Sequence, residues 1–313
     1  MKISVVCPIY NEEKYIEKLI NFFLQSNIAE KELILVDGGS TDATLATIGR
    51  YTAEFPALIK CLHNKFKFAP HAMNIGIRAA TGEYIARVDA HTIYPNDYLE
   101  KCLDISETTG ATNVGGYIHS KGEGMMGDAI AYAMSCKFGV GDSSFRTEIK
   151  DGYVDTVPFG FWKKSAFDTY GYFDEQLIRN QDDELNARFK YKGATIYQSS
   201  KITSEYYVRN SIKKMASQYF QYGLYKPLVL KKVNAAIRLR HLIPALFTLY
   251  LAGAWLAIYC PIYLLPLLFY IALDFYFSFR NNLNFASKWR ALLVFPMLHL
   301  SYGSGFILGL LKK

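Results

Sequence analysis

The sequence predicts an α/β protein in which a mostly parallel sheet with flanking helices precedes a set of apolar C-terminal helices. Through residues 2–117, short apolar segments alternate with segments whose apolar residues recur every three or four positions. Such alternation with short loops predicts parallel strands joined by right-handed crossovers. Apolar residues make up 51% of the 313 residues, and after residue 241 they dominate the chain. We therefore expect a soluble domain over residues 1–205, a basic amphipathic segment over 206–241 and a membrane domain over 242–313.

The elements of the soluble domain follow from local patterns. A first helix, predicted at residues 16–24, has one apolar face, and Glu12 and Glu13 lie near its positive N-terminal end. The loop over residues 38–42 is flexible and contains good helix-capping residues. The alternation predicts strands at residues 2–7, 32–37, 58–63, 83–88, 111–117 and 156–162, and helices at 42–51, 70–80, 95–108 and 182–191.

Residues 119–155 show no clean period. Six glycines fall in this stretch, which favours mobile loops over the edge of the sheet. Irregular stretches of this length in a sizeable domain are often functional lids.

Several classes of protein are disfavoured by the composition. The formal net charge is +7, but the first 241 residues are close to balanced, unlike a nucleic-acid-binding protein. The first loop lacks both the dinucleotide-binding glycine pattern and a Walker lysine. The five cysteines are scattered, which favours reduced, mostly core thiols over disulfides or a zinc site. The N-terminus does not resemble a signal peptide, so we expect the soluble part to stay in the cytoplasm.

A carboxylate and an imidazole, Asp89 and His91, follow the predicted strand at 83–88. The carboxyl edge of an open α/β sheet is where ligands bind. Two residues apart on an extended stretch, the two side chains would point the same way and could hold Mn²⁺ or Mg²⁺ with a diphosphate. The alternative is a solvated turn in which Asp89 caps the next helix.

A second acidic group, Asp182 to Glu184, starts the predicted helix at 182–191. These acids could be capping residues, with Asn180 near the cap position and the carboxylates favoured by the helix dipole. They could also supply a general base held at a helix start beside a polar cleft. The two roles are compatible, because a capped helix is a rigid mount.

The segment from 206 to 241 contains eight basic residues and no acidic one. Aromatic side chains are interleaved with the basic ones, and Met215, Tyr219 and Tyr222 share one apolar helical face. A basic, aromatic helix directly before a long apolar run favours an anionic membrane surface over nucleic acid.

The C-terminal apolar region is long enough to cross a membrane more than once. Residues 242–279 predict two helices in a hairpin broken near Cys260, and residues 291–311 form a third apolar run. Basic residues before and after the hairpin place both of its ends inside. Whether the third run crosses is left open by the sequence. Gly305 and Gly309 could form a helix-pairing face or be apolar filler.

Five short motifs occur in order along residues 1–225: Cys7-Pro8-Ile9-Tyr10-Asn11-Glu12-Glu13, Asp37-Gly38-Gly39-Ser40-Thr41-Asp42, Asn74-x-Gly76, Asp89-Ala90-His91 and Gln181-Asp182-x-Glu184-Leu185. In this order and spacing they resemble family 2 glycosyltransferases of GT-A fold. The form with histidine in the metal motif and C-terminal membrane helices is most similar to bacterial exopolysaccharide and capsule glycosyltransferases of the succinoglycan type.

The resemblance implies a GT-A catalytic domain over residues 1–205 with a nucleotide-sugar site. Asp37 would accept a hydrogen bond from the base, expected to be uracil, and Pro8, Tyr10 and Glu12 would line the nucleoside. The residues that the resemblance assigns to nucleotide-sugar binding are Pro8, Tyr10, Glu12, Asp37, Asn74, Arg78 and Asp89.

The resemblance also implies metal-binding and catalytic residues. Asp89 and His91 correspond to the family's Asp-x-Asp metal motif, and His91 keeps a ligand but removes a charge. Asp182 corresponds to the Asp of the family's Glu-Asp pair, in which Gln181 replaces Glu, and is implied as the catalytic base. Asp183 would take that role if the register differs by one residue.

The function implied is inverting, metal-dependent transfer of a single sugar from a UDP-sugar to a lipid-linked glycan on the cytoplasmic side of the cell membrane. The processive Gln-x-x-Arg-Trp motif is not intact after Gln218, which favours single addition. One alternative is a polyprenyl-phosphate glycosyltransferase. Another is a non-catalytic membrane subunit of a glycan assembly or translocation complex. A nucleotide-sugar donor, a lipid-linked saccharide and membrane lipids are the expected partners, and an oligomer is possible.

Overall fold

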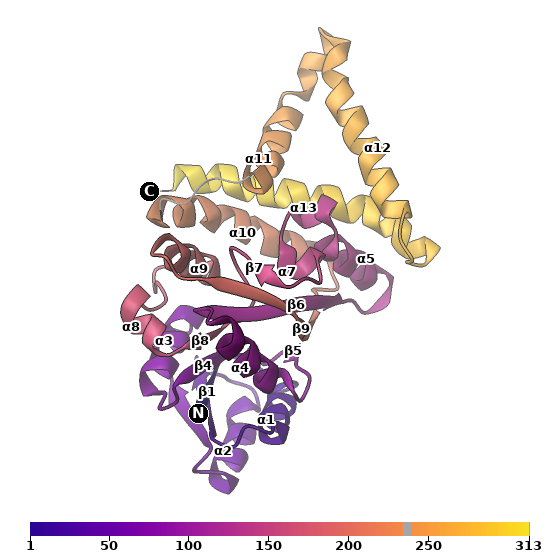
Figure 1. Cartoon of the computed structure of the whole chain (residues 1–313). Coiled ribbons are helices and arrows are strands. Elements are labelled where there is room, and N and C mark those ends of the chain that lie inside the picture. The colour runs from indigo at the N-terminus through magenta and orange to yellow at the C-terminus, as the bar shows by residue number, and fades with distance from the viewer. Residues whose placement is uncertain (234–238, 313) are drawn as a thin grey trace. The chain divides into compact units, whose positions relative to one another are not determined.

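The computed structural model describes residues 1–233 and 239–312, so Arg238 of the basic segment and Lys313 lie outside the described residues. The described chain divides into two compact units (Figure 1). The division after residue 206 lies close to the expected boundary at 205, but residues 120–147 belong with the C-terminal unit. The first unit contains residues 1–119 and 148–206, and the second contains residues 120–147 and the described chain from residue 207 onward.

Four parallel strands form one part of the sheet in the first unit. β1 lies between β2 and β4, and β3 is the outer neighbour of β2. β1, β2 and β4 are buried along nearly their whole length, as expected of parallel strands covered by helices. The elements are β1 (Ile3–Ile9), α1 (Ile16–Gln25), β2 (Lys31–Asp37), α2 (Thr44–Glu54), β3 (Ile59–His63), α3 (Ala69–Ala79), β4 (Tyr84–Arg87) and α4 (Tyr98–Thr109).

The rest of the sheet is antiparallel and differs from the expected arrangement. β8 pairs antiparallel with both β4 and β6, so β6 is not a direct neighbour of the parallel strands. The long strand β9, which the periodicity did not predict, pairs antiparallel with β5 and β7. The α/β class is confirmed, but the sheet is mixed. The remaining elements of this part are β5 (Thr92–Ile93), β6 (Asn113–Lys121), β7 (Gly152–Tyr153), β8 (Phe161–Lys163), α8 (Ser165–Tyr170), α9 (Gln181–Tyr191) and β9 (Ile196–Tyr207).

One face of the sheet carries a core formed with α3, α8 and α9. α3 approaches β1 closely at Gly76, where a Cβ atom would lie 2.3 Å from Cγ1 of Val6. A side chain at this position would overpack the core, so glycine is required for this approach. Large members of the core cluster are Val6, Ile34, Met73, Ile77, Ile85, Trp162, Phe167 and Phe189.

The second unit is helical (Figure 1). α10 and α13 lie side by side, and α11 and α12 form a hairpin whose tip contains the short 3₁₀ helices η1 and η2. The break of the expected hairpin near Cys260 is therefore confirmed. The elements are α10 (Ile212–Val233), α11 (Leu239–Ala252), η1 (Ala254–Ile258), η2 (Pro261–Leu264), α12 (Leu265–Phe279) and α13 (Phe285–Leu311).

The glycine-rich stretch between β6 and β7 is partly helical, so the expectation of loops is wrong there. An apolar run, rich in alanine and methionine, forms α5 and is largely buried. The helices of this stretch are α5 (Gly124–Ser135), α6 (Lys137–Val140) and α7 (Ser144–Thr147).

All five cysteines are free thiols. Cys7 and Cys102 are buried, Cys136 is half-buried, and Cys61 and Cys260 are exposed. The absence of disulfides among the described residues agrees with the expectation, but core thiols are a minority. Cysteine is often buried. Cys61, however, lies at an exposed position of β3, and Cys260 lies at the exposed tip of the hairpin.

Candidate active site

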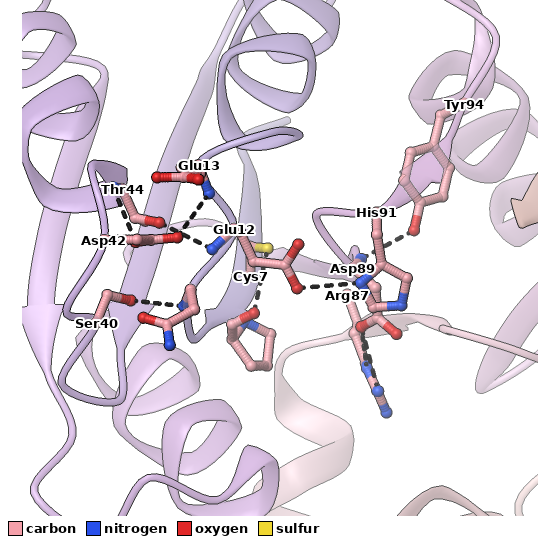
Figure 2. Close-up of polar contacts among 12 residues, drawn as sticks. Cys7, Glu12, Glu13, Ser40, Asp42, Thr44, Arg87, Asp89, His91 and Tyr94 are labelled. Carbon is pink, nitrogen blue, oxygen red and sulfur yellow. Dashed lines mark hydrogen bonds and ion pairs between the residues drawn. The ribbon is translucent and has the colours of Figure 1, made fainter. Parts of the chain in front are cut away.

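Two loops at the carboxyl edge of the sheet are joined by hydrogen bonds (Figure 2). Asn11 adopts a positive φ of 55°. Its backbone N–H donates to Oγ of Ser40 at 2.9 Å, and its Oδ1 accepts from the N–H of Thr41 at 2.8 Å. The N–H of Glu12 donates to Oγ1 of Thr44 at 2.8 Å. These bonds hold the loop after β1 and the loop after β2 as one polar surface.

Asp37, at the end of β2, is buried and shapes its own loop. Its carboxylate accepts from the N–H of Gly39 at 2.8 Å, and from the N–H and Oγ of Ser40 at 3.1 and 2.5 Å. A carboxylate has about four acceptor sites, so a contact with a nucleotide base would add to these bonds. The fold therefore gives Asp37 a structural role in addition to the predicted binding role.

The Asp89 motif follows β4, but it is not extended. β4 ends at Arg87, and the carbonyl of Asp89 accepts from the N–H of Thr92 at 3.2 Å, which closes a turn. The expectation that period-two alternation aligns Asp89 and His91 is wrong, because the chain turns directly after the strand. The turn nevertheless leaves the two side chains close together beside Arg87 (Figure 2).

Each residue of the motif has a protein partner. Nε and Nη2 of Arg87 donate to Oδ1 of Asp89 at 3.3 and 3.2 Å, and the N–H of Asp89 donates to the hydroxyl of Tyr94 at 2.9 Å. Nδ1 of His91 lies 3.1 Å from Oε1 of Glu12. Glu12 thus connects the polar surface after β1 with the motif after β4 (Figure 2).

Asp89 and His91 are of residue types that could hold a divalent cation together with the phosphate groups of a substrate. Their side chains are 26% and 36% exposed, so an ion can reach them. A carboxylate suits Mg²⁺ or Mn²⁺, and imidazole is a common metal ligand. Across the described chain, no three His, Cys, Asp or Glu residues are grouped to hold a metal ion. Two protein ligands completed by substrate phosphates and water are the usual arrangement for Mg²⁺.

The acids of the third candidate region lie in the first turn of α9, as predicted. Asn180 precedes the helix with a left-handed φ of 58°, and its side chain makes no capping hydrogen bond. Glu184 is structural, since its carboxylate accepts from Nε of Arg188 at 2.7 Å. Asp182 and Asp183 are therefore the acids of this turn that could do chemistry.

Asp182 has the charge environment of a general base. Burial raises the pKa of Asp182, and the neighbouring Asp183 carboxylate raises it further, while Arg87 opposes both. Burial lowers the pKa of Arg87, but Asp89 and Asp182 outweigh it and raise that pKa. A carboxylate with a raised pKa accepts a proton more readily near neutral pH. Arg87 is thus the cation whose positive charge interacts with the carboxylates of both Asp89 and Asp182.

Pro8 and Tyr10 lie at the carboxyl end of β1, where a nucleoside was predicted. The ring of Tyr10 is 47% exposed, and Nζ of Lys67 lies 5.8 Å from its centroid. An exposed aromatic ring beside a cation offers a flat surface on which a base can stack.

Asn74 and Arg78 do not join this group of residues. The buried amide of Asn74 donates to the carbonyl of Phe173 at 2.9 Å and accepts from its N–H at 3.0 Å. Arg78 stacks over Tyr172, with 4.3 Å between the guanidinium carbon and the ring centroid. α3 runs back from the carboxyl edge toward the amino edge, so Arg78 in its last turn lies away from the motif residues.

Sequence reasoning missed Arg87 and Tyr94. Arg87 is 7% exposed, and its Nη1 has no hydrogen-bond partner within the described chain. The available signal was an arginine in a four-residue strand that is otherwise apolar. Such a residue is almost never fully buried without a carboxylate partner, and Asp89 lies two positions later.

Two solved glycosyltransferases share the fold of the chain. A mannosyltransferase from Pyrobaculum calidifontis, solved with GDP-Man and Mn²⁺, matches 98% of this chain and 86% of its own at TM-score 0.62 and 15% identity. TarS from S. aureus, solved with UDP-GlcNAc, matches 96% of this chain and 91% of its own at TM-score 0.54 and 16% identity. The chain therefore has a fold of the GT-A type.

Sequence comparison gives the family. The model of glycosyl transferase family 2 matches residues 4–170. The succinoglycan biosynthesis protein ExoA of Rhizobium meliloti is 31% identical over 81% of this chain and 78% of its own length. A dolichyl N-acetyl-α-D-glucosaminyl phosphate 3-β-D-2,3-diacetamido-2,3-dideoxy-β-D-glucuronosyltransferase of Methanococcus voltae is 31% identical over 74% of each chain. The chain belongs to glycosyl transferase family 2 and is a glycosyltransferase.

Proposed function

We propose that the protein is an inverting, metal-dependent enzyme that transfers one sugar from a UDP-sugar to a lipid-linked glycan in cell-surface polysaccharide biosynthesis. The observation that carries the proposal is the polar group at the carboxyl edge of the sheet, where Arg87 bonds to Asp89 at 3.2 Å and His91 lies 3.1 Å from Glu12. Inverting transfer needs a base at the acceptor and charge stabilisation at the departing diphosphate, on opposite faces of the sugar. Asp182 suits the first role and Asp89 the second.

Asp182 is the proposed general base, and Asp183 is the alternative. The acceptor hydroxyl oxygen attacks the anomeric carbon while its proton passes to the carboxylate of Asp182. The bond from the anomeric carbon to the diphosphate oxygen breaks, and the nucleoside diphosphate leaves with the electron pair. Because the hydroxyl oxygen attacks the face opposite the departing diphosphate in a single displacement, the configuration at the anomeric carbon inverts.

On the leaving-group side, Asp89 and His91 would hold Mn²⁺ or Mg²⁺. Such an ion supplies positive charge that stabilises the departing diphosphate. Glu12 orients the ring of His91 through Nδ1, a bond of the kind that fixes the tautomer of metal-binding histidines. Because Arg87 already neutralises part of the charge of Asp89, we expect firm cation binding only when the nucleotide is present.

The donor would bind across the joined loops after β1 and β2. Tyr10 would stack on the base beside Pro8, and the loop shaped by Asp37 would position the nucleoside. TarS solved with UDP-GlcNAc supports a UDP-sugar, whereas the mannosyltransferase solved with GDP-Man and Mn²⁺ makes GDP-sugars the comparison to test.

The acceptor would be a lipid-linked saccharide at the cytoplasmic face of the cell membrane. The printed name of the Methanococcus voltae relative includes a dolichyl phosphate sugar, and the other relative is named for succinoglycan biosynthesis. In the described chain, Pro261–Phe279 and Phe285–Leu311 are long and apolar enough to cross a membrane, and Leu239–Ala252 is a shorter apolar helix. These helices support membrane anchoring, and the basic residues Arg240 and Arg280 at the two ends of the hairpin support a cytoplasmic catalytic unit.

Release of nucleoside diphosphate tests the reaction class. Detergent-solubilised protein is incubated with a panel of UDP- and GDP-sugars and lipid extract, with Mn²⁺ or with EDTA. We expect one donor to be consumed only with lipid and metal. Supplying polyprenyl phosphate in place of lipid-linked saccharide separates the two acceptors. Metal-independent release would overturn the metal assignment.

Replacing Asp182 by Asn tests the base. Because general-base catalysis contributes about 10²–10⁴-fold, we expect Asp182→Asn to lower kcat by that factor while UDP still binds. Asp168→Asn, on the exposed side of α8, is the matched control and should retain activity. A large loss in Asp183→Asn with an active Asp182→Asn would instead assign the base to Asp183.

A further inference from the structure

α13 is long and apolar enough to cross a membrane, but its contacts with neighbouring helices indicate a different placement. It is 27 residues long and, like Pro261–Phe279, contains an apolar window long enough to cross a membrane. A helix of this length is about 40 Å long, longer than the hydrocarbon core of a bilayer. Its neighbours in the second unit determine whether it can be oriented across a membrane.

The C-terminal half of α13 is locked along α10. A Cβ atom on Gly305 would lie 2.1 Å from the carbonyl oxygen of Phe220, and one on Gly309 would lie 2.4 Å from that of Leu224. On the facing helix, a Cβ atom on Gly223 would lie 2.1 Å from the carbonyl oxygen of Tyr302. Three glycines thus allow backbone-to-backbone contact, and Gly305 and Gly309 are a helix-pairing face rather than filler.

α10 is unsuited to cross a membrane. It contains five lysines in 22 residues, and the lysines at its two ends are exposed: Lys213, Lys214, Lys231 and Lys232. Its apolar face, with Met215 and Tyr219, is buried, so this face packs on protein. Since α13 lies side by side with α10, the two helices share one orientation (Figure 1).

The N-terminal half and the middle of α13 contact α5, α6 and α12. Phe295 packs edge-on against Tyr132 of α5 and Phe138 of α6, with centroids 5.9 and 5.0 Å apart. Nε2 of His299 lies 2.8 Å from the carbonyl oxygen of Phe138, and its Nδ1 lies 2.8 Å from the hydroxyl of Tyr270. α13 is therefore held along its length by polar and close-packed contacts.

The opposite side of α13 is apolar and exposed. Phe285, Trp289, Leu293 and Met297 recur every four residues, and Leu308 continues the same side of the helix. Their exposed fractions range from 38% to 70%. A helix that packs one apolar face on protein and presents another to solvent needs a further apolar partner. Trp289 is of the residue type enriched where lipid meets water.

The hairpin has the dimensions of a bilayer core. α11 with η1, and α12 with η2, each extend about 30 Å from base to tip. The tip exposes the aromatic residues Trp255 and Tyr259, while Arg240 and Arg280 lie at the base. Figure 1 shows α11 and α12 rising from α13, and a Cβ atom on Gly303 of α13 would lie 2.2 Å from the carbonyl oxygen of Pro244 in α11.

We propose that α13 lies in the plane of the membrane surface, on the same side as α10, and inserts its apolar stripe into the lipid. The stripe consists of Phe285, Trp289, Leu293, Met297 and Leu308. The partner is the bilayer surface, and α11 and α12 are the two crossing segments. This inference rests on the membrane placement in the proposed function, and it places Lys312 on the side of the catalytic unit.

Labelling of single cysteines from each side of the membrane tests the proposal. The exposed or half-buried Cys61, Cys136 and Cys260 are replaced by Ser in the full chain, and Asn282→Cys or Lys312→Cys is added. A membrane-impermeant maleimide is applied to sealed vesicles of either orientation. We expect both new cysteines to react from the side from which Cys61 reacts in a variant that retains it. Reaction of Lys312→Cys from the side opposite to Asn282→Cys overturns the proposal.

A variant that retains Cys260, at the hairpin tip, separates this proposal from the proposed function. Labelling of Cys260 from the side opposite to Cys61 supports a crossing hairpin. Labelling of Cys260 from the same side as Cys61 refutes membrane crossing by the hairpin, while the Asn282 and Lys312 result still decides the orientation of α13. Recovery of the chain outside the membrane fraction overturns both.

The depth of the middle of α13 gives a second readout. Met297→Trp is made with Trp255→Phe and Trp289→Phe, which leaves Trp162 in the core of the first unit as a constant background. Vesicles contain phospholipids brominated near the headgroup or near the chain ends. We expect a larger loss of Met297→Trp fluorescence with shallow bromines. Stronger quenching by deep bromines would show a crossing helix.

Discussion

At the scale of single residues, Arg87 is the charge on which the candidate site depends. Its guanidinium is buried, bonds to Asp89 at 3.2 Å, and responds to the carboxylate of Asp182. A buried cation needs compensating carboxylates, and two carboxylates near one another need a cation. Arg87 is therefore the buried cation that bonds to Asp89 and opposes the rise in the pKa of Asp182.

The pH dependence of kcat/KM tests the environment of Asp182. A base must be deprotonated, so activity falls as the pH drops through its pKa, and a raised pKa starts that fall at higher pH. Removing the Asp183 charge removes one cause of the raised pKa. We expect Asp183→Asn to move the acidic limb to lower pH. An unchanged limb, with Asp168→Asn as the control, would contradict this assignment.

At the scale of elements, a buried carboxylate ties the strands together at the amino edge of the sheet. Oε1 of Glu32 on β2 accepts from Oγ of Ser4 on β1 at 2.7 Å, and from N and Oγ1 of Thr81 at 2.6 Å each. Oε2 accepts from Nζ of Lys60 on β3 at 2.9 Å. Although burial alone would raise it, the hydrogen bonds from Thr81, Lys60 and Ser4 lower the pKa of Glu32 to about 2.

Glu32→Gln tests this contribution to stability. The folded pKa lies below the unfolded value, so the stabilisation is present above about pH 4.3 and is lost as pH falls toward about 2. We expect Glu32→Gln to lower the free energy of unfolding by about 3 kcal/mol at neutral pH, with a smaller difference in acid. Denaturant unfolding followed by tryptophan fluorescence measures it, and the exposed Glu30→Gln is the control. Equal stability of both variants would contradict the role.

The pairing of α10 with α13 is the second element-scale prediction. A side chain at Gly305 cannot fit, because the Cβ atom alone would overlap the carbonyl oxygen of Phe220. We expect Gly305→Leu to destabilise the helical unit by about 1–3 kcal/mol or more and to lower the melting temperature of the full chain in detergent. Leu308→Ala, on the exposed side of the same helix, should melt close to the unchanged protein. The opposite ranking would contradict the pairing.

At the scale of the whole molecule, the chain joins an α/β unit to a helical unit that exposes many large apolar side chains. α11 presents Leu239, Ile243, Leu246 and Leu249, which are 54–75% exposed and recur every three or four residues. A continuous exposed stripe of this kind marks an apolar partner. In the proposed function, the helical unit would anchor the chain in a membrane and the α/β unit would carry out the chemistry.

Leu246→Arg tests membrane insertion of the hairpin. A charged side chain in the middle of a crossing helix costs about 2.5–3.5 kcal/mol of insertion free energy. We expect Leu246→Arg to reduce the fraction of the full chain that resists alkaline extraction from membranes. Tyr153→Arg, at a 65%-exposed position of the α/β unit, should not change that fraction. Undiminished retention of Leu246→Arg would count against insertion of α11.

Much of the site could be predicted because its residues are local in the sequence. Asp37, Asp89 and Asp182 each follow a strand or begin a helix, and such positions meet at one edge of an α/β sheet. The pairing of Glu12 with His91 and the place of Arg87 could not be predicted, because they depend on how distant segments align. Asn74 was assigned to binding, but its amide is used by the backbone of Phe173, 99 residues away.

The sequence by itself determined the elements of the parallel half, the hairpin break and the polar loops, because periodicity and turn residues act over a few positions. Only the tertiary structure decided that β8 lies between β4 and β6, and that β9 completes the sheet. It also decided the environment of α13. A helix apolar on both faces looks the same in sequence whether it crosses a membrane or packs on another helix, because hydropathy records how apolar a segment is and not what covers it.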